Sequence, residues 1–145
     1  MAALYRKQLV LVFREKYKRL AYQPTGTYYS SYNHKGVHHL KIIYHCYGGS
    51  HSSVIAAALH LGMLPKNQIP TEEMLMAIPY YDKTSNADFG SIRFMGKDEF
   101  NNEVYVLGKK SMGERCSHLL LGIAEVLGCK DELLVVNCFN RVNLA

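Results

Sequence analysis

Residues 40–65, LKIIYHCYGGSHSSVIAAALHLGMLP, decide the fold class of this chain. The β-branched and aromatic residues at positions 41–46 are typical of a strand packed in a sheet. Two glycines then interrupt the strand, because glycine adopts backbone angles that are closed to other residues. The alanine-rich segment that follows predicts a buried helix with Ser50 as its N-cap and Gly62 as its stop. A strand, a Gly/Ser loop and a helix therefore start the domain.

The loop between this strand and helix has the composition of an anion site. The first amides of a helix lack partners within the helix and carry a partial positive charge, so phosphate or carboxylate binds there readily. The loop matches neither the Walker A pattern nor G-x-G-x-x-G, and a tight turn capped by serines is the alternative. Small neighbours keep the amides within reach of a ligand. The predicted anion-binding residues are Gly48, Gly49, Ser50, His51, Ser52 and Ser53.

Length and composition indicate one domain that is ordered over most of its length. The chain has 145 residues, of which 48% are hydrophobic, and it contains no run of 18 apolar residues that could span a membrane. Its first residues lack the apolar core and cleavage site of a signal peptide. The cysteines form no C-x-x-C pair, so we expect reduced thiols and a cytoplasmic location. They are Cys46, Cys116, Cys129 and Cys138.

The net positive charge of the chain comes from its N-terminal part. Residues 1–39 carry seven lysines or arginines and one acid, whereas residues 40–145 carry ten and eleven. Residues 3–22 fit a basic amphipathic helix or a solvated extension, and the following residues resemble a linker. We expect residues 1–39 to be an extension, or upstream sequence translated from a mis-assigned start, and residues 40–145 to be a single domain. The charge of that domain gives no argument for a nucleic-acid partner.

The middle of the chain predicts a short helix, an irregular segment and a hairpin. Thr71 is placed to cap a helix that must stop before Pro79. Residues 80–90 have no periodicity and are expected to fold over a neighbouring site. Residues 91–108 alternate as two strands joined at Asn101, since asparagine tolerates the positive φ of tight turns.

The last third of the chain predicts a helix followed by a strand. Ser111 and Glu114 form an S-x-x-E capping box. The continuous apolar run at residues 133–138 is typical of a strand buried on both faces. Gly128 ends the helix, and its apolar stripe at helical spacing is Cys116, Leu119, Leu120, Ile123, Ala124 and Leu127.

These elements predict an α/β fold with a small sheet. Central parallel strands, with the first and last strands near the middle, combine with a β-hairpin and packed helices. Ligands of open α/β sheets bind at the carboxyl ends of the strands. The expected site is therefore the loop that leads from Cys46 to Ser53.

Three sequence blocks resemble the bacterial domain-of-unknown-function family 3189. They are KIIYHCYGGSHSSVIAAALHLGMLP, IPYYDK and FMGKDEFNNEVYVLG, in this order, and the likeness covers about residues 40–138. The resemblance implies a small cytoplasmic protein of Firmicutes-type bacteria and brings no activity with it. Two departures are the 39 leading residues, which lie outside the family pattern, and the end at Ala145, where the pattern continues a little further.

Cys46, His51 and Asp82 are the candidate catalytic residues. A cysteine that faces a helix start has a lowered thiol pKa. The layout is similar to low-molecular-weight tyrosine phosphatases, in which the nucleophilic cysteine opens a C-x5-R-S loop. Ser52 and Ser53 occupy the last two positions here, so the arginine that clamps the phosphoryl oxygens is missing. Asp82 is a candidate general acid, and a buried structural cysteine is the alternative.

No metal site is predicted from the histidines, cysteines and acids. His45 and Cys46 are adjacent in a strand and therefore point to opposite faces, and His51 follows in the loop. His60 is expected to be a packed or surface histidine. The acids that flank the hairpin turn are expected to be solvated charges; they are Asp98, Glu99 and Glu103.

The sequence thus supports three functions in order. The first is binding of a phosphate-bearing small molecule at the strand–loop–helix site. The second is a non-enzymatic interaction or regulatory role, in which the loop is only a capped turn. The third is hydrolysis of a phosphatase-like kind that depends on Cys46. The pattern specifies neither a cofactor nor an oligomeric state.

Overall fold

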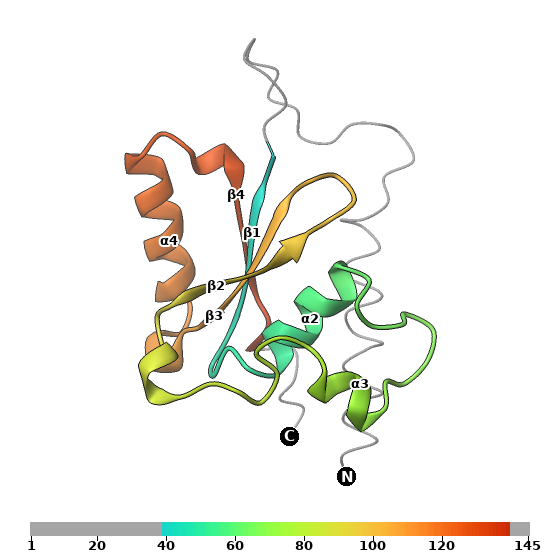
Figure 1. The fold of residues 1–145 in the computed structure, drawn as a ribbon. Helices are drawn as coiled ribbons and strands as arrows, with labels where there is room; N and C mark the ends of the chain where they lie inside the picture. The colour runs from blue at the N-terminus through green and yellow to red at the C-terminus, as the bar shows by residue number, and fades with distance from the viewer. Residues whose placement is uncertain (1–38, 140–145) are drawn as a thin grey trace.

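The computed structural model describes residues 39–139. They form a four-stranded sheet with the strand order β2-β3-β1-β4 (Figure 1). β1 runs parallel to β3 and β4, whereas β2 and β3 form an antiparallel hairpin. The strands are β1 (Lys41–Cys46), β2 (Ile92–Lys97), β3 (Glu103–Gly108) and β4 (Leu133–Asn137). The predicted α/β class, with central parallel strands and a hairpin, is confirmed.

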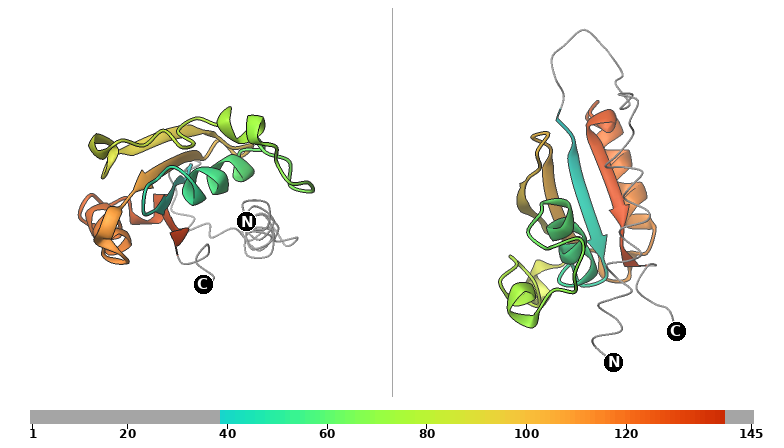
Figure 2. Two further views of the ribbon diagram at one scale, coloured as in Figure 1. Left: turned by 90° about the horizontal axis from the view of Figure 1, so that it is seen from below. Right: turned by 90° about the vertical axis from the view of Figure 1, so that its right-hand side faces the viewer.

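Three helices and three short 3₁₀ turns connect the strands in the described part of the chain. The helices are α2 (Ser52–His60), α3 (Glu72–Met76) and α4 (Arg115–Val126). The turns are η1 (Asn86–Asp88), η2 (Lys110–Met112) and η3 (Lys130–Glu132). Figure 2 shows α2 and α4 on opposite faces of the sheet. Within residues 39–139, no helix has the length and apolar character needed to cross a membrane.

The larger core lies between α2 and the sheet. Alternate residues of a strand point to the same face, so Ile42, Tyr44 and Cys46 of β1 all pack on this side. The three alanines at positions 56–58 are each at most 3% exposed. Their small side chains let the helix approach the sheet closely.

The smaller core lies on the other face, beneath α4. Ile43 and Leu107 from the sheet pack there against Cys116 of the helix. Leu119 and Ile123 belong to the predicted apolar stripe, but they are 53% and 49% exposed. The predicted amphipathic helix is therefore present, and only part of its apolar stripe faces the sheet.

The predicted capping box of α4 is wrong. Ser111 lies within η2, and the N-cap is Glu114, which makes no capping hydrogen bond with its side chain. The chain bends at Gly113, where φ is 58°. The carboxylate of Glu114 instead accepts a hydrogen bond from the side-chain amide of Asn137. A contact with β4 has thus replaced the local contact that the spacing predicts.

The last strand lies at the edge of the sheet, and not near its centre as we expected. Among the described strands, β4 pairs with β1 alone, and all five of its residues are partly exposed. A continuous apolar run indicates that side chains are covered, but it carries no information on how many strands flank it. The middle positions belong to β1 and β3.

Other local predictions are confirmed. The hydroxyl of Thr71 caps α3 by accepting from the amide of Met74 at 3.3 Å. Gly62 has φ of 70° just after α2, the left-handed conformation that ends a helix. Asn101 has φ of 64° in the hairpin turn. Each signal depends on neighbours only a few residues away.

The loop after β1 is held against the end of β3 by a close backbone contact. Cys46 and Gly108 are partners in the parallel register, so both strands end at the same level. A Cβ atom on Gly49 would lie 2.4 Å from the backbone nitrogen of Gly108, and one on Gly108 would lie 2.6 Å from the carbonyl oxygen of Gly48. We expected Gly49 to leave room for a ligand, but this space is filled by β3.

The close contact predicts that Gly49→Ala destabilises the fold more than Gly62→Ala. Both glycines are left-handed, with φ of 68° and 70°, but a Cβ on Gly62 meets no atom within 4 Å. Gly62→Ala should lower the free energy of unfolding by about 1 kcal/mol, and Gly49→Ala by about 2–4 kcal/mol. Urea denaturation of the two variants measures the difference. Equal losses would show that the loop moves away from β3 without cost.

Candidate functional site

The candidate site lies at the carboxyl ends of the parallel strands, where β1 passes into α2. The helix begins one residue later than predicted, since its N-cap is His51 and not Ser50. Ser50 is buried, and its carbonyl oxygen accepts a hydrogen bond of 3.1 Å from the amide of Asp82. His51 makes no capping hydrogen bond with its side chain. The N-cap residue itself therefore contributes no side-chain cap to α2.

The sulfur of Cys46 is the centre of the loop. The amide of Gly49 donates to Sγ over 3.1 Å, and Sγ and the Ser53 hydroxyl are also 3.1 Å apart. The residue is 4% exposed, so these contacts form out of water. The hydrogen-bond donors of the loop thus point inward, to the sulfur atom of Cys46.

These donors favour the thiolate form of Cys46. Burial raises the pKa of the thiol, but hydrogen bonds from the hydroxyls of Ser52 and Ser53, and from the amides of Ser53 and Gly49, lower it below its ordinary value. Cys116 is equally buried, and burial raises its pKa with only a partial opposing effect from Lys109. The pKa values of the two buried thiols are therefore shifted in opposite directions, because Cys46 has hydrogen-bond donors around its sulfur.

The first turn of α2 also holds amides with no backbone partner. Among the described residues, the amides of Ser52 and Val54 donate to no backbone carbonyl. Unpaired amides at an incompletely capped helix start are the donors that a bound anion takes up.

His51 and Asp82 meet at the rim of the loop. Nε2 of His51 lies 3.2 Å from Oδ1 of Asp82, and both side chains are more than half exposed. The ring of Tyr81 meets the His51 ring edge-on, with centroids 5.5 Å apart. The structure therefore brings these two candidate catalytic residues together at the surface, and Cys46 lies inside the loop.

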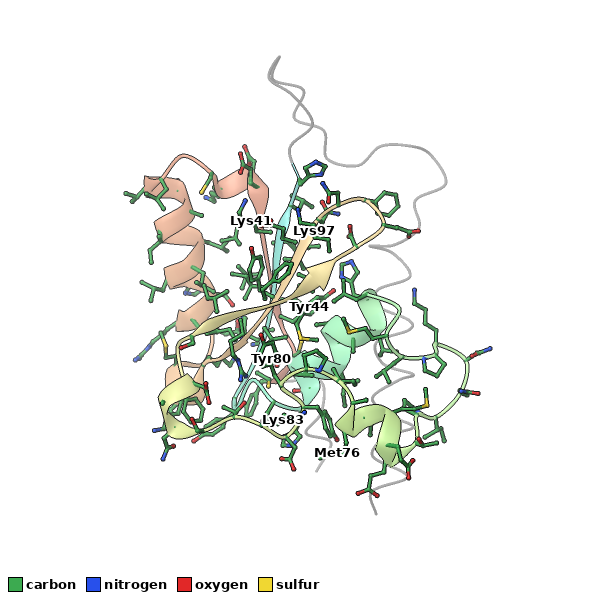
Figure 3. The ribbon with its side chains drawn as sticks, in the orientation of Figure 1. Lys41, Tyr44, Met76, Tyr80, Lys83 and Lys97 are labelled. Atoms are coloured by element: carbon green, nitrogen blue, oxygen red, sulfur yellow. The ribbon has the colours of Figure 1, made fainter. Side chains whose placement is uncertain are left out.

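Residues 80–84 pack against the loop, as the irregular sequence of this region predicts. The amide of Asp82 donates to the carbonyl oxygen of Ser50. The hydroxyl of Thr84 accepts a hydrogen bond from Arg93, which also donates to the carbonyl oxygen of Gly49 in the loop. Tyr80 and Asp82 have φ of 66° and 52°, which is strained for residues other than glycine. Figure 3 shows Tyr80 and Lys83 on this connection, at the end of the sheet where the loop lies.

Arg93 of β2 is a site residue that the sequence did not reveal. Its Nη2 donates to the carbonyl oxygen of Gly49 at 2.7 Å and to the hydroxyl of Thr84 at 3.0 Å. Its guanidinium lies 4.6 Å from the centre of the Tyr80 ring. Its Nε is buried and has no hydrogen-bond partner among the described residues. One signal was available, because a single arginine interrupts an otherwise uncharged stretch of the first hairpin arm.

Lys109 brings a second cation to the same edge of the sheet. It follows β3, is 3% exposed, and its amide donates to the carbonyl oxygen of Cys46 at 3.0 Å. Its ammonium group donates to the side-chain oxygen of Asn137 at 3.0 Å and lies 5.5 Å from the centre of the Phe139 ring. A buried ammonium group raises the electrostatic potential at the carboxyl ends of the strands.

His45 lies on the opposite face from Cys46, as alternation in a strand predicts. It is fully buried, and its Nε2 is 2.8 Å from the hydroxyl of Ser117 on α4. Burial lowers the pKa of His45 to about 4, with a further lowering by Lys109 and a partial opposing effect from Glu114. Within residues 39–139, no three histidine, cysteine or acidic side chains gather in a group that could hold a metal ion.

His60 and Asp98 stabilise the junction of α2 and the hairpin. The ring of His60 bridges the Tyr44 hydroxyl at 2.9 Å and the Asp98 carboxylate at 3.0 Å. The Asp98 side chain is only 6% exposed and also accepts from the amides of Phe100 and Asn102. The expected packed histidine is confirmed, but the expectation of a solvated charge is wrong for Asp98, because it organises the turn.

Comparison with protein-family models assigns the chain to a family. A family model described as "Protein of unknown function (DUF3189)" matches residues 41–145. The chain belongs to this family. The match includes all four strands and the loop, and the family's description names no activity. Comparison with curated proteins and with solved structures gives no match.

The loop contacts predict that Cys46 is alkylated at lower pH than Cys116. The two thiols are equally buried, at 4% and 3% exposure, so the pH midpoint of the rate reports mainly their pKa values. The midpoint for iodoacetamide should lie at lower pH for Cys46 than for Cys116. Mass spectrometry of digested samples measures both rates, and Ser53→Ala should raise the Cys46 midpoint. A common midpoint for both cysteines would contradict this account.

The buried His45 predicts a loss of stability in mild acid. Because its pKa falls from 6.5 to about 4 on folding, the unfolded chain binds a proton in this interval that the folded chain excludes. The free energy of unfolding should therefore decrease as the pH falls from 6.5 to 4, by up to about 3 kcal/mol. Urea denaturation at several pH values measures this slope. His45→Gln should flatten it, and an unchanged slope would assign the effect to other groups.

Proposed function

We propose that this protein binds a phosphate-bearing small molecule, such as a nucleotide or a sugar phosphate, on residues 48–53. The observation that carries the proposal is the incompletely capped start of α2. Its N-cap, His51, supplies no side-chain acceptor, and the amides of Ser52 and Val54 have no backbone partner. A phosphate oxygen would complete these hydrogen bonds and would lie in the positive field of the helix.

The charges around the loop support an anionic ligand. Arg93 contacts the loop backbone at Gly49, and Lys109 is buried at the end of the neighbouring strand. Both cations lie at the carboxyl ends of the parallel strands, where ligands of α/β sheets bind. The loop itself contains no lysine or arginine, so we expect modest affinity, between millimolar and micromolar, or about 4–8 kcal/mol.

A second candidate function, hydrolysis of a phosphate ester through Cys46, is favoured by the lowered pKa of its thiol. In such a reaction the thiolate forms a bond to phosphorus, and the bond from phosphorus to the leaving oxygen breaks. Asp82, at the loop rim, would supply the proton that the leaving oxygen takes up. Water would then split the sulfur–phosphorus bond and release phosphate.

The loop lacks the arginine of the phosphatase pattern, and Arg93 replaces it only in part. Nη2 of Arg93 already donates to a loop carbonyl and to Thr84. A guanidinium that holds the outside of the loop stabilises its shape more than it clamps a phosphoryl group. Binding is therefore the first proposal, and catalysis the second.

An aspartate at the N-cap should oppose ligand binding. His51→Asp introduces a negative charge at the N-cap, close to Asp82, so it should repel a phosphate group and remove phosphate binding. The wild type should gain about 2.7 kcal/mol at a ligand concentration of 100 times Kd. Thermal melting in inorganic phosphate, nucleotides and sugar phosphates measures both effects. Asn67→Asp is the control, since residue 67 is exposed outside the loop and acquires the same charge.

Three outcomes of this titration are informative. Loss of stabilisation in His51→Asp alone supports binding at the loop. Equal responses of the wild type and both variants would place the anion elsewhere, and no response in the wild type would leave the loop as a turn.

A phosphatase assay tests the second candidate function. Release of p-nitrophenol from p-nitrophenyl phosphate by the wild type, and not by Cys46→Ser, would support hydrolysis through Cys46.

A further inference from the structure

The outer face of α4 is apolar and faces away from the sheet. In Figure 1 the helix stands at the margin of the fold, beside β4. Cys116 and Ala124 bury its inner side. Four large side chains remain exposed on the outer side and the last turn; they are Leu119 (53%), Ile123 (49%), Val126 (87%) and Leu127 (72%). With His118 and Gly122, they line a shallow groove along the helix.

This apolar face is more than scattered surface residues. Four large apolar side chains fall within nine consecutive positions of one helix, on a surface that α4 does not need for its own packing. Contiguous exposed apolar patches on soluble domains mark interaction sites. The α4 face is therefore a candidate binding surface, and the charges of the helix indicate the kind of partner.

The charges within α4 oppose its dipole, although the acid Glu114 at its N-cap offsets part of this effect. Arg115 lies in the first turn and Glu125 in the last, and neither a first-turn acid nor a last-turn base is present. A cation at the start of a helix and an anion at its end each cost about 0.3–1 kcal/mol relative to the reverse order. Glu125 is partly compensated by Lys130, whose ammonium group is 3.0 Å away. A partner molecule can place opposite charges near the two ends of the helix and compensate them further.

The surroundings extend this separation of charge. The exposed residues at the start of α4 include two cations and one acid: Lys110, Arg115 and Glu114. The residues at its end include three acids and one cation: Glu125, Asp131, Glu132 and Lys130. The two ends of the same apolar face thus have opposite charge. A surface of this kind is complementary to a copy of itself turned end to end.

We propose that the α4 face binds a second copy of this chain, with the two helices antiparallel across a two-fold axis. The axis passes near Gly122, where a Cβ atom would meet nothing within 4 Å and the helices can approach closely. The basic start of each helix then lies opposite the acidic end of the other. A parallel arrangement would bring like charges together, so the charge pattern selects the antiparallel one.

The oligomeric state of the full chain tests the proposal. Sedimentation equilibrium should show a dimer that dissociates on dilution, and Ile123→Glu should weaken it at least tenfold. Val126→Glu repeats the test at a more exposed position, so loss of folding does not explain the result; circular dichroism verifies the fold of both variants. Monomer at every concentration of the wild type would overturn the proposal, as would a dimer that both variants leave intact.

Charge reversals and a crosslink test the antiparallel arrangement. Arg115→Glu and Glu125→Arg should each weaken the dimer several-fold, because each reduces the attraction between the basic start of one helix and the acidic end of the other. Gly122→Cys should form a disulfide-linked dimer on mild oxidation, as two residues near a two-fold axis can. A dimer that neither charge reversal weakens, or no crosslink at position 122, would overturn the antiparallel arrangement.

Discussion

The close contact between two backbone segments, at Gly49 after β1 and Gly108 at the end of β3, is the constraint on which the site depends. Neither position has room for a side chain. The contact determines where the loop turns, and it places the Gly49 amide 3.1 Å from the sulfur of Cys46. It also brings Lys109, the next residue of the chain after β3, to the same edge. A single backbone contact thus positions the thiol, the loop donors and a buried cation together.

The loop has more hydrogen-bond donors than the protein uses. Some converge on Cys46 and lower the pKa of its thiol, against the opposing effect of burial. Others, at Ser52 and Val54, have no backbone partner. Arg93 binds the carbonyl side of the same loop, which leaves the amide side for other acceptors. An anionic ligand and a cysteine thiolate require the same environment, so the binding and the hydrolytic proposals share one geometry.

The sequence predicts the local structure well because glycine, threonine and asparagine act over a few residues. The strand–loop–helix unit, the stop at Gly62 and the hairpin turn at Asn101 are examples. Predictions that depend on distant parts of the chain were less reliable. β4 lies at the edge of the sheet, Asp98 is buried by His60, and the expected capping box of α4 is replaced by a contact with Asn137. Arg93 reaches the loop from 44 positions away, a distance at which no spacing rule applies.

The central claim is that the loop after β1 accepts an anion through its backbone amides. The most direct measurement is a titration of the ¹⁵N-labelled full chain with inorganic phosphate, followed by amide chemical shifts. The account predicts saturable changes concentrated at the start of α2, at Ser52 and Val54, with Kd between millimolar and micromolar. Shifts that are absent, unsaturated, or spread over the basic residues of the surface would contradict it.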